Sequence, residues 1–295
     1  LIASVTYHWP CVSIDVSAAF LQGLPLEEAK TTTGKARSVW CRPPADVWGI
    51  LRELQGKYGL TLPVKGYESH WLWKLLKAAY GLDDAPLLWR KAIGDFLLDH
   101  GWVESHYDRC MYYKRAGNDK RGRLVGVLTL HIDDEGAAGE EPVLTSLRTS
   151  MEARFGECKF QKDSFRHIGH EYTQTWGKDG TTITDSQEFY TKTIKSIPIP
   201  SGSRQRKLTE LEMSLLRILN GEMGYGSETR PDAMGRIAYS RQNVDKDAIV
   251  EHLIEANKAL AAVQNPHATK ALRYAPLDYS KLKLVGIADG ALRKK

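Results

Sequence analysis

The sequence predicts an α+β fold in which a mixed N-terminal region is followed by a mainly helical one. Short apolar runs at 107–114 and 124–132 alternate with the two-residue period of strands. Elsewhere apolar residues recur with the period of a helix, most clearly at 86–97. Beyond a Pro, Gly and Ser cluster at 197–207 the helical period prevails, which indicates a second structural part.

The composition is that of an ordinary folded chain. Its 295 residues, 42% hydrophobic and 26% charged, are enough for one large domain or two smaller ones. No apolar run approaches the roughly 20 residues of a membrane-spanning helix, and no signal-peptide pattern precedes the first elements. The four cysteines form no CxxC pair, which argues against a disulfide framework or zinc ribbon and favours a reducing, intracellular compartment. The net charge of +5 permits a nucleic-acid partner without requiring one.

The first predicted elements are a strand and, after an irregular stretch, a helix. Residues 11–22 form an apolar run that contains Asp15, as expected of a short strand. Residues 23–70 carry Gly, Pro and Thr punctuation and show no long period. From Pro86 onward a helix is predicted that Gly101 stops, because apolar side chains share one face at Trp89, Ile93, Phe96 and Leu97.

A hairpin, a second helix and further strands follow. The runs 107–114 and 124–132 are joined by a polar, basic stretch and are therefore predicted to form a hairpin. A helix is predicted over 142–155 from its apolar spacing. Residues 165–190 alternate like strands again, with a turn at 178–180.

The last part of the chain is predicted to be a separate helical domain. The segment 197–207 combines Pro, Gly, Ser and basic residues, as a linker does. We therefore expect one domain at 1–196 and a second at 208–280. In the second, Asp245 is the predicted N-cap of a helix that buries Ile249, Leu253 and Leu260.

Two adjacent acids, Asp133 and Asp134, directly follow an apolar strand that ends at Ile132. Neighbouring carboxylates repel each other and cost stability unless a cation lies between them. The simpler interpretation is an Asp-Asp turn in an ordinary hairpin, because Asp favours turns. On this stretch alone the sequence favours the turn.

Asp15 shifts the balance toward a metal site. It too lies inside an apolar strand, where an unpaired carboxylate is costly. If the two strands are neighbours, three carboxylates converge, and such oxygen ligands suit Mg²⁺, with Mn²⁺ as the alternative ion. Two ions about 4 Å apart can activate an attacking oxygen and stabilise a leaving one in phosphoryl transfer. We therefore predict that the Asp15 and Asp133 carboxylates lie within about 6 Å of each other.

The first apolar strand reads SIDVSAAFLQG and the acidic pair lies in HIDD, and four further segments follow in a fixed order. Together the six resemble motifs of copia-type retrotransposon reverse transcriptases, in the order found in that family. SIDVSAAFLQG is similar to the first catalytic motif, and HIDD to the Y-x-D-D box. Between them, WKLLKAAYGLDDAPLLW resembles the family's L-Y-G-L-K-Q-A-P segment. SFRHIGHEY and ETRPDAMGRIAYSR resemble its F-L-G-I-E and T-R-P-D-I segments, and LKLVGIADGA the first strand of its RNase H domain. Each motif is weak alone, but the ordered set covers nearly the whole chain.

The resemblance implies a reverse transcriptase palm, an antiparallel sheet backed by helices, followed by a mainly helical thumb. The reaction would be RNA-directed DNA synthesis, a nucleotidyl transfer with two Mg²⁺ ions. Asp15, Asp133 and Asp134 would be the catalytic carboxylates and the metal ligands. Phe20 would bind the nucleotide by lying under its sugar and excluding a 2′-hydroxyl. The simpler interpretation of Phe20, a core side chain, is the one that sequence alone favours.

The resemblance also implies partners and a setting. The substrates would be an RNA template, a DNA primer and deoxynucleoside triphosphates, and no membrane is involved. Because the chain begins at Leu1 rather than Met, we expect a fragment of a Pol polyprotein that also carries integrase and RNase H segments. Asp289, in a truncated strand at 281–295, would match the first acid of the RNase H site. Cytoplasmic virus-like particles and the nucleus are both consistent locations.

Three departures from the family pattern bear on activity. His131 stands where the box has Tyr, close to the expected primer end. Asp83 and Asp84 replace a Lys-Gln pair near the expected triphosphate, and like charge there should weaken nucleotide binding. The basic fingers strands that precede the first motif in the family are not part of this sequence.

Two other functions remain open at this point. An inactive or domesticated remnant would keep the fold and at most bind nucleic acid, as the three departures favour. An unrelated two-metal nuclease or phosphatase would share the acids but not the ordered segments. Other candidates are weaker: His167 and His170 are more typical of a surface pair than of a metal site, and the basic residues at 114–123 could contact phosphate or form a solvated turn.

Overall fold

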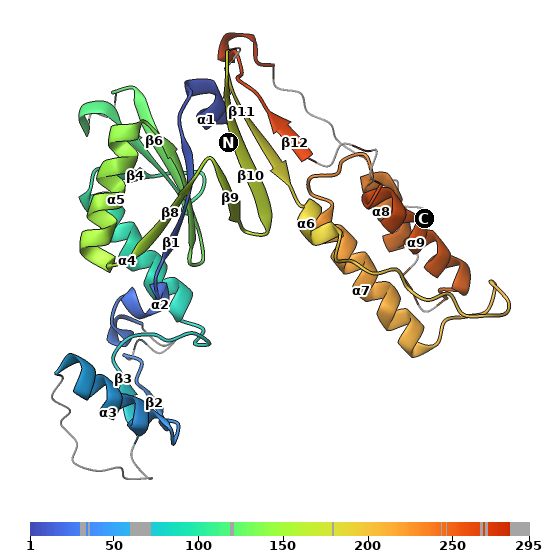
Figure 1. Ribbon diagram of the computed structural model, residues 1–295, viewed down its shortest axis with the longest axis horizontal. Helices are drawn as coiled ribbons and strands as arrows, with labels where there is room; N and C mark the ends of the chain where they lie inside the picture. The colour runs from blue at the N-terminus through green and yellow to red at the C-terminus, as the bar shows by residue number, and fades with distance from the viewer. Residues whose placement is uncertain are drawn as a thin grey trace. The chain divides into compact units, whose positions relative to one another are not determined.

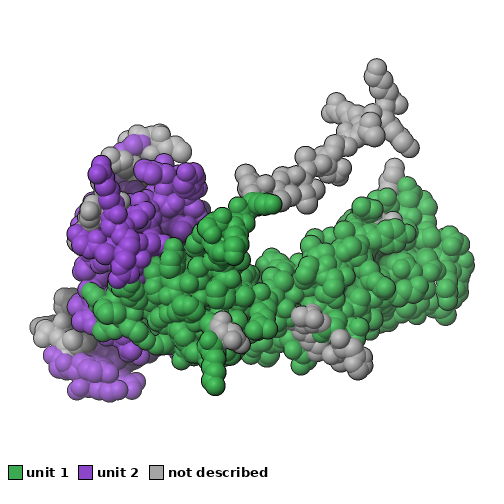
Figure 2. Space-filling model, turned by 90° about the horizontal axis from the view of Figure 1, so that it is seen from above, with its two compact units in different colours: residues 1–14, 136–146, 160–295 green, residues 15–135, 147–159 purple. Residues whose placement is uncertain are grey.

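The computed structural model describes residues 1–29, 34, 36–59, 72–118, 121–178, 180–242, 244–245, 247–265, 268 and 271–283 (Figure 1). The chain forms two compact units, which Figure 2 shows in different colours. Unit 1 consists of residues 1–14, 136–146 and 160–295, and unit 2 of residues 15–135 and 147–159. Together they mix helices with antiparallel sheet, as the sequence predicted.

The largest sheet has six strands in the order β4-β5-β6-β7-β1-β8 (Figure 1). Their bounds are β1 Cys11–Val16, β4 Trp102–Glu104, β5 Met111–Arg115, β6 Leu124–His131, β7 Asp134–Gly139 and β8 Cys158–Lys162. Strand β5 is antiparallel to both β4 and β6, and Tyr112 lies opposite Leu128. The predicted hairpin is therefore confirmed, although its first strand begins only at Met111.

Helix α4, Ala85–Asp99, is central to the core of unit 2. Its buried side chains recur at helical spacing, and Leu88, Trp89, Ile93 and Leu97 are all 0% exposed. Burying side chains of this size contributes roughly 1.5–3 kcal/mol each. Pro in the first turn and Gly101, with φ 77°, mark the two ends that the sequence predicted.

The second predicted helix is confirmed as α5, Glu141–Phe155, which is followed by Gly156 with φ 81°. Its last residue joins the core of unit 2. The Phe155 ring lies edge-on to Trp89 and Phe96, with centroid separations of 5.2 and 5.1 Å. Such edge-to-face pairs add to the stabilisation that comes from burial alone.

The stretch that the sequence predicted to be irregular contains several short elements. They are η1 Leu26–Glu28, β2 Val39–Cys41, α3 Val47–Tyr58 and, just beyond it, β3 Trp73–Leu75. Before that stretch, the strand expected at 11–22 ends at Val16, and α2, Ala19–Gln22, follows it. Strands β2 and β3 are antiparallel. The sequence did not reveal α3, because Gly49 and Gly56 lower its helix propensity and none of its side chains is buried.

Unit 1 contains a four-stranded antiparallel sheet in the order β12-β11-β10-β9 (Figure 1). Its strands are β9 Ser164–His167, β10 His170–Gly177, β11 Gly180–Ser186 and β12 Ala271–Tyr274, and helix α1, Ile2–Tyr7, contacts β11. Ile168 and Gly169 form the β9–β10 turn with φ values of 49° and 74°. Gly177 pairs with Gly180 at the predicted second turn, of which Asp179 lies outside the described residues.

The helical part of unit 1 consists of α6 Glu188–Thr191, α7 Glu210–Gly226, α8 Met234–Gln242 and α9 Val250–Val263, and η3 Tyr279–Lys281 follows β12. A shared core of buried apolar side chains joins the helices: Ile194, Ile197, Leu216, Leu219, Met223, Ile237, Leu253 and Leu260. Helix α7 begins with a reciprocal capping box between Thr209 and Glu212. None of the described helices is long and apolar enough to cross a membrane.

The predicted N-cap of α9 is wrong by one turn. The helix begins after Ile249, whose backbone N–H donates to His252 Nδ1. Asp245 instead accepts from the backbone N–H of Asp247, which makes a turn before the helix. Asp is common both in turns and at helix N-caps, so the sequence pattern alone predicted the start of the helix four residues too early.

The segment 197–207 does not separate the compact units. Ile197 and Asn257 exchange two hydrogen bonds of 2.9 and 2.7 Å, and Lys207 forms a bridge with Ile249. These contacts hold both ends of the segment on α9, because buried backbone groups need partners. The structure groups residues 160–295 with residues 1–14 in one compact unit. Whether 1–196 and 208–280 act as separate domains stays a prediction. Asp289 and residues 284–295 lie outside the described residues.

Candidate active site

The strand order places the two predicted acidic positions on neighbouring strands of one sheet. Strand β7, which begins at Asp134, lies between β6 and β1, and β1 carries Asp15. Ile132 and Asp133 form the two-residue turn between β6 and β7. The structure contains the Asp-Asp turn and places β1, which carries Asp15, next to β7. That the Asp15 and Asp133 carboxylates lie within about 6 Å of each other stays a prediction.

The turn itself is strained. Ile132 has a φ of 58° and a side chain that is 55% exposed. A β-branched residue rarely adopts this left-handed conformation, which glycine tolerates at little cost. Strain of this kind costs on the order of 1–3 kcal/mol and tends to occur at functional sites. It lies directly beside Asp133.

A fourth acid, Glu135, lies beneath the other three. Its side chain is 1% exposed and neither carboxyl oxygen has a hydrogen-bond partner. Burial raises its pKa well above 4.5, and the charges of Asp134, Asp133 and Asp15 raise it further, in that order. The Trp89 indole N–H lies near enough to lower the pKa slightly, although the pair falls outside hydrogen-bonding geometry. The charges of the three other acids therefore reach the buried Glu135 carboxyl.

Cys158, on β8 beside β1, faces the same acids. Burial raises the pKa of its thiol to about 11, and the charges of Glu135, Glu152 and Asp15 contribute in that order. A thiol with such a pKa stays protonated at neutral pH and is a poor nucleophile. The site therefore offers carboxylate oxygens rather than sulfur to a ligand.

Phe20 and Tyr80 are two aromatic side chains that contact each other, and the nucleotide-binding role of Phe20 stays a prediction. Phe20 is 7% exposed, whereas Tyr80 is 57% exposed and its ring centroid lies 4.6 Å from that of Phe20. Burial raises the pKa of Tyr80, followed by the charges of Asp133 and Asp15. Tyr80 therefore lies within electrostatic reach of both acids, while Phe20 is mostly covered.

The acidic pair at the start of α4 is only half as negative as the sequence suggested. Asp84 forms an ion pair with Arg37, and both side chains are partly buried. Asp83 is exposed and has no ion pair among the described residues. The repulsion expected for a bound triphosphate thus comes mainly from Asp83, because the Arg37 charge offsets that of Asp84.

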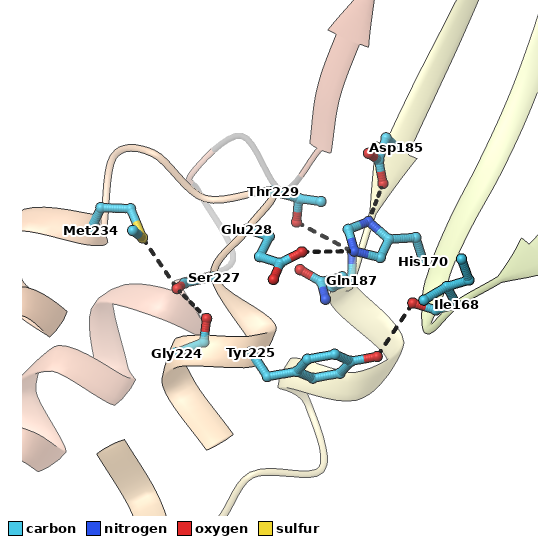
Figure 3. A network of polar contacts seen from close by, with 10 residues as sticks. All are labelled: Ile168, His170, Asp185, Gln187, Gly224, Tyr225, Ser227, Glu228, Thr229 and Met234. Atoms are coloured by element: carbon cyan, nitrogen blue, oxygen red, sulfur yellow. Dashed lines mark hydrogen bonds and ion pairs between the residues drawn. The ribbon is translucent and has the colours of Figure 1, made fainter. Parts of the chain in front are cut away.

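The histidines of the β9–β10 hairpin have protein partners in unit 1. His167 Nδ1 lies 3.2 Å from Ser13 Oγ. Figure 3 shows His170 between two carboxylates, with Nδ1 2.7 Å from Asp185 and Nε2 3.2 Å from Glu228. The prediction of a surface pair is wrong for His170, whose side chain is 13% exposed.

The basic hairpin tip is partly used by the fold. Lys114 Nζ donates to the backbone carbonyl of His100, and Arg115 donates to that of Gly122. Burial lowers the pKa of Lys114. Lys120 lies outside the described residues, so contact of this tip with phosphate stays a prediction.

The acids do not form a complete metal site by themselves. Among the described residues, no group of three or more His, Cys, Asp or Glu side chains could hold a metal ion. Asp15 is exposed and Asp133 and Asp134 are half-exposed, so solvent reaches all three. An open set of carboxylate oxygens fits Mg²⁺, which keeps several waters and takes only one or two carboxylates.

These features define a class of protein: an α+β domain with an acidic hairpin turn beside an acidic strand. Residues 63–201 match the family model described as reverse transcriptase (RNA-dependent DNA polymerase). This match includes Asp133, Asp134 and Tyr80 but begins after Asp15 and Phe20.

A second comparison agrees with the family model. The chain is 26% identical over 141 residues to the retrovirus-related Pol polyprotein from transposon RE1 of Arabidopsis thaliana. The matched region covers 48% of this chain and 8% of that polyprotein. Both comparisons support a retrotransposon Pol reverse transcriptase domain in this chain, which spans only a small part of the polyprotein that it matches.

The sequence analysis did not predict that Glu135 and Tyr80 belong to the surroundings of the acids. Glu135 is a third consecutive acid, and the two-residue period of β7 places it on the buried face with Ala137. That period was a usable signal. Tyr80 gave no comparable signal, because its exposure depends on how α2 and α4 pack.

Proposed function

We propose that this chain is the polymerase part of a copia-type Pol polyprotein and catalyses RNA-directed DNA synthesis. The single observation that supports this most is the position of Asp15 beside the β6–β7 turn that carries Asp133 and Asp134. The six-stranded sheet with α4 and α5 would serve as the palm, and the helices α7 to α9 as the thumb. The polyprotein's other segments would be integrase and RNase H.

In the proposed reaction the primer 3′-oxygen forms a bond to the α-phosphorus of a deoxynucleoside triphosphate. The bond between that phosphorus and the bridging oxygen breaks, and pyrophosphate leaves. Two Mg²⁺ ions, when bound, would supply the positive charge that stabilises both oxygens. Asp15 and Asp133 would hold the two ions, and Asp134 would assist as an outer carboxylate.

The residues of the chain contribute mainly position and electrostatics. No described cation pairs with Asp15, Asp133 or Asp134, so their charge is free to attract metal and triphosphate complexes. Glu135 is buried next to Asp134 in the chain, and burial raises the pKa of its carboxyl. Holding both reactants in place can lower the barrier by roughly 7–11 kcal/mol.

The test is Mg²⁺-dependent incorporation of a labelled deoxynucleotide on a primed RNA homopolymer. We expect Asp133→Asn to reduce incorporation by at least about 100-fold, as loss of a charged group in a reacting site does. The midpoint temperature of thermal unfolding should be unchanged or slightly higher, because removing one of several like charges relieves repulsion. Asp99→Asn, an exposed acid on α4, is the matched control and should leave incorporation intact.

An inactive remnant is the outcome that would replace this proposal. It would show normal folding and nucleic-acid binding but no incorporation above that of Asp133→Asn. The exposed Asp83, which stands where the family pattern has Lys, favours weak nucleotide binding. Asp83→Lys should therefore lower the KM for the nucleotide if the polymerase proposal is right, and Arg37→Ala, which frees the charge of Asp84, should raise it.

A further inference from the structure

We infer that His170, Asp185 and Glu228 form a pH-sensitive joint that fastens the end of α7 to the four-stranded sheet of unit 1. The joint is closed while the imidazole ring of His170 carries a second proton, and it releases Glu228 when the ring loses that proton. All three residues belong to unit 1, and the inference does not depend on the proposed function.

The joint lies where the sheet meets the helical part of unit 1 (Figure 3). His170 begins β10 and Asp185 lies on the neighbouring strand β11, so both belong to the sheet. Glu228 follows α7, which ends at Gly226. The Nδ1 atom of His170 lies 2.7 Å from Asp185 Oδ1, and its Nε2 atom lies 3.2 Å from Glu228 Oε2. One imidazole ring therefore connects the sheet with the helical part.

The protonation of the ring decides whether both contacts can exist. A carboxylate only accepts hydrogen bonds, whereas a neutral imidazole donates from one nitrogen and carries a lone pair on the other. A neutral ring between two carboxylates therefore places one lone pair against an oxygen, which is repulsive. The protonated ring donates from both nitrogens, and its charge strengthens each bond. The two short contacts of His170 are thus those of the protonated ring.

Burial decides which contact survives when the ring loses a proton. The side chains of His170 and Asp185 are 13% and 6% exposed, while that of Glu228 is 59% exposed. A buried carboxylate that loses its donor is costly, whereas an exposed one exchanges the donor for water. The remaining proton therefore stays on Nδ1, toward Asp185, and Glu228 turns to solvent. The joint is complete at low pH and opens as the pH rises through the range of about 5 to 8 in which histidines ordinarily titrate.

Two tyrosines of the sheet lie beside the joint. The Tyr172 ring is stacked on that of His170, with centroids 5.9 Å apart. Burial raises the pKa of Tyr172 and that of Tyr274 on β12, and the charge of Asp185 raises both further. Both phenols therefore keep their protons near neutral pH, and neither provides the change of charge.

The remaining ionisable groups around the joint have partners of their own. His167 pairs with His170 across the β9–β10 turn, and its Nδ1 lies 3.2 Å from a serine hydroxyl of β1. A hydroxyl can donate or accept, so this contact survives either protonation state of His167. The Tyr225 hydroxyl of α7 donates to a backbone carbonyl of the β9–β10 turn. Arg166 of β9 and Glu171 of β10 form an ion pair with each other.

The surroundings of the joint also contain an unused polar group. Gln187 is 1% exposed, and neither atom of its side-chain amide has a hydrogen-bond partner. Its backbone N–H donates to the hydroxyl of Thr229, the residue that follows Glu228. Buried amides without partners are rare, so the closed joint does not satisfy every polar group around it. This is expected where a second arrangement, with Glu228 released, lies close in free energy.

The experiment measures amide hydrogen exchange of residues 224–233 in the full chain, at about pH 5.5 and about pH 8. Each rate is divided by that of the unstructured peptide at the same pH. We expect the protection of these amides to fall roughly tenfold at the higher pH, as the loss of one charge-assisted hydrogen bond predicts. Equal protection at both pH values overturns the inference.

Glu228→Gln is the decisive variant, because it replaces an exposed carboxylate by an amide of the same size. The introduced amide accepts from the protonated ring and donates to the neutral one, so protection should become nearly independent of pH. His170→Gln should also remove the dependence. Glu210→Gln, an exposed acid at the other end of α7, and His106→Gln, an exposed histidine of unit 2, are the matched controls and should retain the full fall. A fall that persists in Glu228→Gln overturns the inference.

Nuclear magnetic resonance reports the proton on the ring directly. In a chain with isotope-labelled histidine, the ring signals that are missing from His170→Gln belong to His170. At about pH 5.5 both of its nitrogens should be protonated, and at about pH 8 only Nδ1. A ring with a single proton at both pH values overturns the inference even if protection changes, because the pH dependence then belongs to another group.

Discussion

Acidic side chains have cationic or histidine partners in one region of the molecule and lack cationic partners in another. In unit 1, Asp185 and Glu228 contact His170, Glu212 contacts Arg206, and Asp232 contacts Arg230. In unit 2, the acids at the β6–β7 turn have no cationic partner among the described residues, and a buried Glu135 lies under them. Paired acids hold a fold together, whereas clustered unpaired acids cost stability. Under the proposed function, a bound cation would offset the charge of the second arrangement.

Arg230→Ala should have the largest effect on stability and would test whether pairing holds unit 1 together. The Arg230 side chain is 3% exposed. It forms two hydrogen bonds with Asp232 and also donates to the carbonyls of Ala262 and Val263 at the end of α9. Removing one partner of a buried charge network typically costs about 3–5 kcal/mol. The measurement is the free energy of unfolding in urea.

Arg236→Ala is the matched control for that experiment, because Arg236 is exposed on α8. It should change the free energy of unfolding by less than about 0.5 kcal/mol. Arg230→Lys should fall between the two, since lysine keeps the charge but cannot form the paired geometry. Equal effects of all three changes would show that the network does not stabilise the helices.

His170→Ala should have the next largest effect. It should lower the free energy of unfolding by about 1–3 kcal/mol, because it leaves the buried Asp185 without its histidine partner. Glu228→Gln should cost much less, because the Glu228 side chain is 59% exposed. Urea unfolding of both variants measures the difference. If Glu228→Gln proved the more costly, the stabilisation would come from the exposed half of the network instead.

Glu135→Gln sharpens the comparison through its pH dependence. Because the folded-state pKa is raised, folded Glu135 binds a proton more tightly than the unfolded chain does. Its contribution to stability is complete below pH 4.5 and is lost as the pH rises toward the folded-state pKa. With divalent cations chelated, the unaltered chain should lose stability over this interval, and Glu135→Gln should lose less. If stability fell equally with pH in the unaltered chain and in Glu135→Gln, Glu135 would not be the group that causes the pH dependence.

Glu212 should show the opposite dependence with the smallest effect. The Arg206 hydrogen bond, followed by that of the Thr209 backbone, lowers the pKa of Glu212 from 4.5 to about 2. Its contribution is complete above pH 4.5 and is lost as the pH falls toward 2. Solvent screens this partly exposed pair, so Glu212→Gln should raise the pH midpoint of acid unfolding only slightly. If Glu212→Gln changed the pH dependence of stability more than Glu135→Gln does, the predicted ranking of the two effects would be wrong.

Local patterns predicted some parts of the site and missed others. The β5–β6 hairpin and the two acids after β6 were evident, because alternation and turn chemistry depend on nearby residues. Phe20 and Tyr80 were harder to interpret. Both are aromatic residues in apolar surroundings, and only the packing of α2 on α4 leaves one covered and the other exposed. Likewise, the partner of Asp84 lies far along the chain at Arg37, where no local pattern points to it.

By itself the sequence determined α4, α5, the hairpins and the acidic turn, because helical and strand periods and turn residues act over a few positions. The tertiary structure alone decided that β1 lies beside β7, so that Asp15 shares a sheet end with Asp133 and Asp134. It also decided that Glu135 is buried beneath them. The physical reason is that pairing between distant strands is selected by the burial of the whole sheet and its helices, to which every element contributes.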